Sequence, residues 1–196
     1  MHYEIYKNAR DTNWRFLIQH KICSLPVDLK LITSTMKITV RKDNSVILYT
    51  NERGRTVNEN GVLHIIVRDD PIPQKRYTIM HEIGHIVLGH TESDGRSDVD
   101  EYATERFAIG VLAPACVLWG IGIKTAEEIA DLCNISITSA KIREKRMQEL
   151  YDRNKFLTSP LEHQVFEQFS DFINSKKTEH IIYKMYKHKG RNQFLP

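Results

Sequence analysis

The sequence predicts an α+β fold that is mostly helical, with a small three-stranded antiparallel sheet followed by a helix-turn-helix-like helical subdomain. Residues 38–67 hold three short runs rich in β-branched residues, and turn residues separate them. The segments on either side repeat their apolar residues at helical spacing. A capping-box sequence at residues 125–128 then opens two further short helices.

Length and composition indicate one sizeable core and a cytoplasmic protein. The chain has 196 residues and a formal net charge of +3, which does not by itself identify a partner. Its three cysteines, Cys23, Cys116 and Cys133, lack metal-ligand spacing, so we expect small buried hydrophobic residues rather than disulfides. The N-terminus lacks the apolar core of a signal peptide, and no apolar run approaches the ~18 residues of a membrane span.

The N-terminal elements are expected in the following order. A helix over about residues 4–23 is followed by a short helix around residues 29–32. Three strands are then expected at residues 38–41, 46–50 and 62–67, with turns between them. We expect the unit to end at residue 122, which divides the chain into residues 1–122 and 123–196.

The next helix, expected over about residues 74–89, contains the pentapeptide His81-Glu82-Ile83-Gly84-His85. Histidines four residues apart point the same way on a helix, which suits two ligands of one metal ion. Glu82 is placed to take a proton from a metal-bound water, as in the HExxH arrangement of zinc hydrolases. Gly84 is costly inside a helix and indicates a close approach by a neighbouring segment, and Gly89 is expected to end the helix. The alternative is a buried helix with two satisfied histidines and no metal.

A catalytic zinc site needs a third protein ligand. The metzincin pattern is excluded, because the positions at which it requires a glycine and a third histidine hold Leu88 and Thr91, and Gly89 and His90 are out of frame. On a second helix, expected over about residues 98–113, Glu101 and Glu105 share a partly apolar face. One interpretation makes Glu101 the third ligand and Glu105 the acceptor for the free N–H of a ligating imidazole. The alternative is that these acids merely favour a helix N-terminus, with Asp98 as the cap. The acidic candidates for the third ligand are Glu92, Asp94, Asp98, Asp100, Glu101 and Glu105.

Two segments carry a resemblance to a known family. Residues 76–90 resemble the motif R-x-T-x-x-H-E-[LIF]-G-H-x-x-L-[GH]-H of ImmA/IrrE-type zinc metallopeptidases. Residues 101–114 resemble that family's E-x-x-A-[NE]-x-[FW]-A-x-x-L-L-x-P, with Thr104 in place of the usual alanine and Ala113 where methionine is common. Pro26-Val27-Asp28-Leu29 also matches the family, and the resemblance covers about residues 10–150.

The resemblance implies a zincin-like peptidase unit that uses one zinc ion per chain. Glu101 falls on the family's third zinc ligand, beside His81 and His85, and Glu82 is the general base. The resemblance also implies the substrate, a helix-turn-helix transcriptional repressor of a phage or mobile element. The alternative is a non-proteolytic regulator that binds a repressor or DNA and holds a structural zinc. Four residues are candidate donors to the transition state, which the sequence does not rank: His64, Arg76, Tyr77 and His90.

The C-terminal part reads as a helix-turn-helix over about residues 123–150. Thr125 opens its first helix, Asn134 takes the turn position and Ser136 begins the second helix. Basic residues on the second helix could contact nucleic acid, but acidic residues interleave with them, and we do not expect specific DNA binding. These nucleic-acid candidates are Lys141, Arg143 and Lys145. One more helix is expected at about residues 161–174, before a basic tail whose role the sequence does not indicate, with Lys184, Lys187, Lys189 and Arg191.

Overall fold

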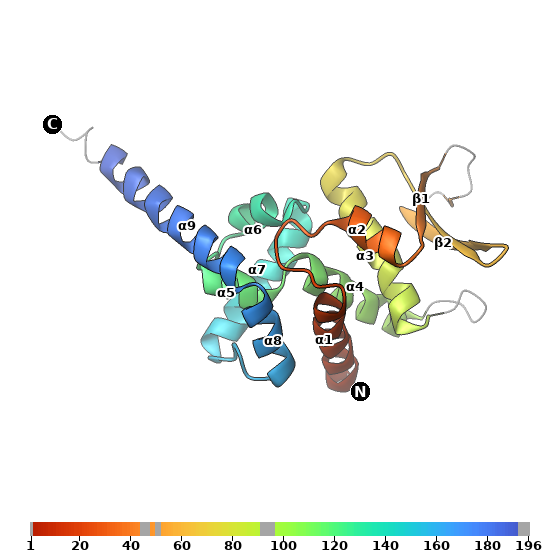
Figure 1. Ribbon diagram of the computed structural model, residues 1–196, viewed down its shortest axis with the longest axis horizontal. Helices are drawn as coiled ribbons and strands as arrows, with labels where there is room; N and C mark the ends of the chain where they lie inside the picture. Colours follow the sequence, from red (N-terminus) through yellow and green to blue (C-terminus); the bar gives the residue numbers. More distant parts are fainter. Residues whose placement is uncertain (1, 44–47, 50–51, 91–96, 192–196) are drawn as a thin grey trace.

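The structure is a computed structural model that describes residues 2–43, 48–49, 52–90 and 97–191. It confirms the predicted α+β class, because helices dominate and the described strands form one small sheet. In Figure 1 the sheet lies at one end of the molecule, and the last helix projects from the other end. The elements are α1 (His2–Gln19), α2 (Leu29–Thr35), β1 (Thr39–Lys42), β2 (Gly54–Glu59), β3 (Val62–Val67), α3 (Ile72–Leu88), α4 (Asp98–Leu112), α5 (Ala115–Ile121), α6 (Ala126–Cys133), α7 (Ile137–Asp152), α8 (Pro160–Gln168) and α9 (Ser170–Arg191).

The sheet is mixed, so the prediction of an antiparallel sheet was wrong. The strand order is β1-β3-β2: β2 and β3 pair antiparallel, whereas β1 and β3 pair parallel. The reason is the short turn at Asn60 and Gly61, which both have positive φ angles, of 53° and 84°. A two-residue turn of this kind joins adjacent antiparallel strands, which places β3 in the centre and leaves its other edge for β1.

The second strand also lies at a different place from the predicted one. It is β2 rather than residues 46–50, most of which are outside the described residues; Leu48 is described, and it is buried but not in a strand. β2 has the sequence GRTVNE and lacks the apolar alternation on which the prediction depended. It forms a strand because the turn after it folds it against β3.

Helices α3 and α4 pack closely against each other. A Cβ atom on Gly84 would lie 2.9 Å from Thr104 Cγ2 and 3.0 Å from Phe107 Cδ1, which confirms the predicted close approach. Gly89 ends α3 with a left-handed φ of 74°, also as predicted.

The cap of α4 differs from the predicted one. Ser97, not Asp98, is the N-cap: its hydroxyl accepts from the Asp100 N–H at 3.2 Å, and the Asp100 carboxylate accepts from the Ser97 N–H at 3.1 Å. This capping box fixes the first turn of α4, from which Glu101 projects.

Helices α4 and α5 run through the interior. Within the described part of the chain, Asp98–Ile121 is the one helical stretch long and apolar enough to cross a membrane by length and composition alone. Most of it, 72% of its apolar window, is buried inside the molecule, as in the core helices of globular proteins. Cys116 and Cys133 are buried, as predicted, but Cys23 is exposed, so the prediction for that cysteine was wrong.

The C-terminal helices follow the predicted helix-turn-helix and then depart from prediction. Thr125 and Ser136 cap α6 and α7, and Asn134 takes the left-handed turn position, as expected. The single helix expected at residues 161–174 is two helices, α8 and α9, which meet at Phe169. The backbone of the predicted basic tail is helical up to Arg191, the end of α9.

One apolar cluster runs through the described residues on both sides of residue 122. It includes Leu17 of α1, Phe107 of α4, Ile129 of α6 and Phe169 beside α8. This shared core joins residues 1–122 and 123–196. The division of the chain at residue 122 stays a prediction.

A candidate metal centre on helices α3 and α4

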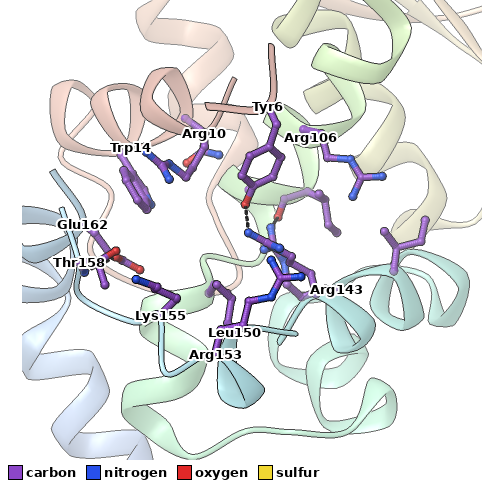
Figure 2. Close-up of a pocket in the computed structure, with 16 residues that line it drawn as sticks. Tyr6, Arg10, Trp14, Arg106, Arg143, Leu150, Arg153, Lys155, Thr158 and Glu162 are labelled. Atoms are coloured by element: carbon purple, nitrogen blue, oxygen red, sulfur yellow. Dashed lines mark hydrogen bonds between the residues drawn. The ribbon is translucent and has the colours of Figure 1, made fainter. Parts of the chain in front are cut away.

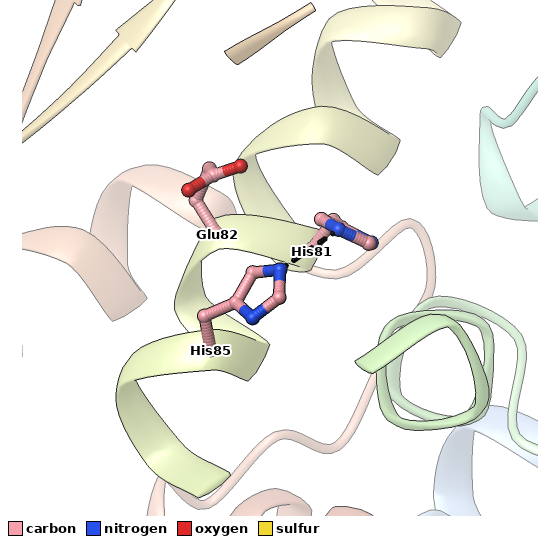
Figure 3. Close-up of side chains that lie close together, drawn as sticks. All are labelled: His81, Glu82 and His85. Carbon is pink, nitrogen blue, oxygen red and sulfur yellow. Dashed lines mark hydrogen bonds between the residues drawn. The ribbon is translucent and has the colours of Figure 1, made fainter. Parts of the chain in front are cut away.

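Two histidines of α3 place their Nε2 atoms together. His81 and His85 are one turn apart, and their Nε2 atoms are separated by 3.0 Å. Their ring centroids are 4.7 Å apart, with the rings nearly perpendicular. Figure 3 shows the two imidazoles facing one another on one side of the helix. This is the arrangement expected of i, i+4 residues on a helix.

Glu101, in the first turn of α4, is the third residue of the set and places one carboxylate oxygen beside each imidazole nitrogen. Its Oε2 lies 3.1 Å from His81 Nε2, and its Oε1 lies 3.4 Å from His85 Nε2. The ligand atoms of a tetrahedral zinc ion with bonds of ~2.0–2.1 Å lie about 3.3 Å from one another. Two imidazole nitrogens and one carboxylate oxygen are also a donor set that zinc accepts. These three residues therefore fit a metal ion in both spacing and chemistry.

Glu82 is buried beside these donor atoms, and its carboxylate is bonded to a different element of the fold. Its side chain groups with the two histidines within 4.8 Å, so it could also be considered as a ligand. Figure 3, however, shows its carboxylate standing apart from the point where the imidazoles meet. The carboxylate accepts a hydrogen bond of 3.0 Å from Thr56 Oγ1 on β2. Glu82 is thus placed next to the metal centre, with Glu101 as the better third ligand.

A polar chain lies behind His85. Its Nδ1 is 3.4 Å from Thr104 Oγ1 and 3.2 Å from His90 Nδ1, and His90 Nε2 lies 3.3 Å from an Asp100 carboxylate oxygen. Hydrogen bonds from Ser97 are the main cause that lowers the pKa of Asp100, so this carboxylate is ionised at neutral pH. Such outer contacts fix the orientation of a metal-binding imidazole.

Glu105 does not take the place predicted for it. Its side chain is exposed, and the buried Nδ1 of His81 has no hydrogen-bond partner among the described residues. At His85 the neighbouring groups are Thr104 and His90 instead. Glu105 lies one turn beyond Glu101 on α4, further along the helix from the imidazoles. Of the other predicted third ligands, Glu92 and Asp94 lie outside the described residues.

An open cleft of about 340 Å³ lies over the metal centre. Strand β2 forms one side of it through Gly54, and Tyr77 and Thr78 of α3 lie opposite. Gly54 is needed here, because a Cβ atom would collide with the Thr78 methyl group. Among the described strands β2 lies at the edge of the sheet, beside β3. The candidate metal centre therefore sits below the outer edge of the sheet, which β2 forms.

A protein-family model described as the IrrE N-terminal-like domain, a peptidase family, matches residues 35–128. That range contains the whole HExxH helix, Glu101 and the sheet above them. Residues 35–128, just under half of the 196-residue chain, are therefore similar to this family. Among curated proteins, no relative matches.

Within the IrrE-like domain, Tyr77 is the predicted transition-state donor that lies at the cleft. Its ring centroid is 6.1 Å from that of His81, one turn further along α3. Burial is the main cause that raises the pKa of its phenol, and the nearby carboxylates of Glu105 and Glu101 raise it further. The hydroxyl consequently keeps its proton at any physiological pH and can donate a hydrogen bond.

The other three predicted donors lie elsewhere in the IrrE-like fold. His64 is on the opposite face of the sheet from Ile65 and Thr56, and its Nε2 lies 3.3 Å from an Arg41 nitrogen. Arg76 donates to the Val27 carbonyl at 2.8 Å and so anchors the segment before α2. His90, as described above, contacts His85 from behind. None of these three faces the cleft.

Among the nucleic-acid candidates, Arg143 points inward rather than to solvent. It is 8% exposed and donates to the Ile109 carbonyl of α4 at 2.7 Å, so its assignment as a DNA-contacting residue was wrong. Lys141 and Lys145 are exposed on α7.

Sequence reasoning missed two residues of the site, Thr56 and Thr104. No sequence pattern indicated Thr56, because β2 was not predicted. Thr104 was visible as a departure from the alanine that is usual in the family motif, and this departure supplies the hydroxyl beside His85.

Proposed function

We propose that this chain is a zinc-dependent endopeptidase in which His81, His85 and Glu101 hold one zinc ion. The observation that carries the proposal is the convergence of two imidazole nitrogens and the two oxygens of one carboxylate, from two helices, at separations of 3.0 to 3.4 Å. A buried carboxylate, Glu82, lies beside them. A structural zinc site requires the ligands but not this additional acid.

Three polar residues at or beside the cleft, Glu82, Thr56 and Tyr77, have roles in peptide hydrolysis. When bound, zinc supplies Lewis-acid chemistry, polarising a carbonyl group and acidifying a water molecule. Glu82 accepts the proton of the attacking water at its carboxylate and then delivers it to the leaving amine. Thr56 holds that carboxylate in place by its hydrogen bond. Tyr77 donates a hydrogen bond to the oxyanion.

The substrate is a polypeptide in extended conformation that pairs with the outer edge of β2, the edge that β3 does not occupy. Main-chain hydrogen bonds to an exposed strand edge provide affinity, and side-chain pockets provide selectivity. The family resemblance supports a helix-turn-helix repressor of a phage or mobile element as this polypeptide, and hence action in the cytoplasm. We do not assign a DNA-binding role to α7, whose Arg143 is buried.

The decisive experiment compares the parent protein with Glu82→Gln on the helix-turn-helix repressor encoded beside it. Glutamine keeps the shape of the side chain but cannot take up a proton. We expect Glu82→Gln to keep its fold and its zinc and to lose cleavage, measured by mass spectrometry of the products. Relief of repression in cells should be lost with it. If Glu82→Gln relieves repression as well as the parent does, the protein acts by binding, as a non-proteolytic regulator, and the peptidase proposal fails.

A further inference from the structure

A second cavity lies away from the metal centre, between α1, α4, α7 and α8. It has a volume of about 330 Å³, within the range of small-molecule sites. Figure 2 shows cationic side chains approaching it from several elements. Glu162 is the one acidic residue among those that line it. This cavity is called here the arginine pocket. The cationic residues that line it are Arg10, Arg106, Arg143, Arg146, Arg153 and Lys155.

Arg143 forms the buried part of the arginine pocket. One of its terminal nitrogens donates to the Ile109 carbonyl, but its Nε has no hydrogen-bond partner among the described residues. Burial is the main cause that lowers its pKa, to about 10, and the nearby Arg146 and Arg106 lower it further. A buried guanidinium normally has a carboxylate or another anion beside it, because desolvating an unpaired charge is costly.

The arginine pocket carries more positive charge than the protein neutralises. Arg10 pairs with Asp11, and Arg146 pairs with Glu149. Within the described part of the chain, the other four cationic side chains form no ion pair with a carboxylate. Six cations against three carboxylates, with Glu162 counted as the third, leave three unbalanced positive charges around one small cavity.

The remaining walls suit an organic ligand. Asn13 lines the arginine pocket, is 4% exposed, and has a side-chain carbonyl oxygen without a partner among the described residues. That oxygen can accept a hydrogen bond from a hydroxyl or amino group. Trp14 and Tyr6 add aromatic surface.

We propose that the arginine pocket binds a small organic phosphate that carries two or more negative charges and at least one hydrogen-bond donor. Guanidinium groups bind phosphate oxygens in pairs of parallel hydrogen bonds, and several of them converging from different helices match a compact polyanion better than a single carboxylate. A nucleic-acid strand is a poorer match, because the cationic groups surround a concave cavity and do not follow an extended groove. The proposal is independent of the peptidase function, since none of these residues belongs to the candidate metal centre.

The test is isothermal titration calorimetry of the full chain with inorganic pyrophosphate at one fixed salt concentration. We expect binding of one pyrophosphate per chain. The double variant Arg153→Gln/Lys155→Gln should weaken it roughly tenfold or more, because each charge-assisted hydrogen bond contributes substantially. Arg143→Gln should do the same, and its folding is checked separately by circular dichroism. Glu162→Gln should tighten binding by roughly twofold or more, because it removes the opposing charge.

Lys141→Gln is the matched control, because Lys141 lies on α7 but is exposed and does not line the arginine pocket. It should leave pyrophosphate binding unchanged. No detectable pyrophosphate binding, or binding that the double variant leaves intact, overturns the proposal. A single-stranded oligonucleotide that binds more tightly than pyrophosphate through the same residues also overturns it, and makes this surface a nucleic-acid interface.

Discussion

At the residue scale, a hydroxyl from the sheet contributes to the geometry around Glu82. Thr56 Oγ1 donates to the buried carboxylate at 3.0 Å, and this contact joins β2 to the HExxH helix. A buried carboxylate that loses a donor becomes free to rotate and more costly to keep ionised. The position of Glu82 relative to the metal ligands therefore depends on a residue from a different element.

We expect Thr56→Val to lower kcat/KM for repressor cleavage roughly tenfold or more, since a hydrogen bond to a charged group is worth about 1.5–3 kcal/mol. Valine has nearly the same shape, so zinc content should not change. Thr56→Ser, which keeps the hydroxyl, should retain most of the activity. Equal activity in Thr56→Val and the parent would show that Glu82 is positioned by other groups.

The sequence alone predicted the site residues that share one helix turn. It did not predict the residues that come together only through tertiary packing. His81, Glu82 and His85 lie close together because helix periodicity places them so. Glu101 was reached through its motif and its position on the next helix. The polar contact between His85 and Thr104 depends on the side-by-side packing of α3 and α4. The periodicity of the sequence does not specify this packing.

At the scale of elements, the distance between α3 and α4 decides whether Glu101 can reach the histidines. Gly84 allows the close approach, with Thr104 and Phe107 packed where a side chain would otherwise be. The contact lies directly before His85 on α3 and about one turn after Glu101 on α4. A wider spacing at this point would withdraw Glu101 from His85.

We expect Gly84→Ala to lower the free energy of unfolding by about 1 kcal/mol. An added methyl group in a packed core costs roughly 1–3 kcal/mol, and the better helix propensity of alanine offsets ~1 kcal/mol of that. Urea unfolding measures the change. In a Thr104→Ala background, which removes the Cγ2 atom that the new methyl would meet, the cost should fall to about half or less. If the cost is the same in both backgrounds, the contact is not between these two side chains.

The sheet shows why strands were harder to predict than helices. β3 is apolar and buried at its end, and it was predicted at its observed position. β2 is polar and became a strand only through the turn at Asn60 and Gly61. The parallel pairing of β1 follows from the order of strands, a property of the whole sheet that no single segment reveals.

At the scale of the whole molecule, α4 joins two separate sites. Its first turn supplies Glu101 to the candidate metal centre, and its later turns supply Arg106 and Ile109 to the arginine pocket. The family match ends at residue 128, within α6, so α7 and α8, which complete that pocket, lie outside it. The pocket thus combines the IrrE-like domain with helices that are not part of the matched domain.

The central claim is that His81, His85 and Glu101 together hold a zinc ion beside Glu82. Zinc content by mass spectrometry after dialysis, in the parent, Glu101→Gln and Glu105→Gln, tests it most directly. Glu105→Gln is the matched control, because its side chain lies one turn away on the same helix and is exposed. We expect close to one zinc per chain in the parent and in Glu105→Gln, and a large loss in Glu101→Gln. Full zinc occupancy in Glu101→Gln, or loss in Glu105→Gln alone, would contradict the assignment of the third ligand.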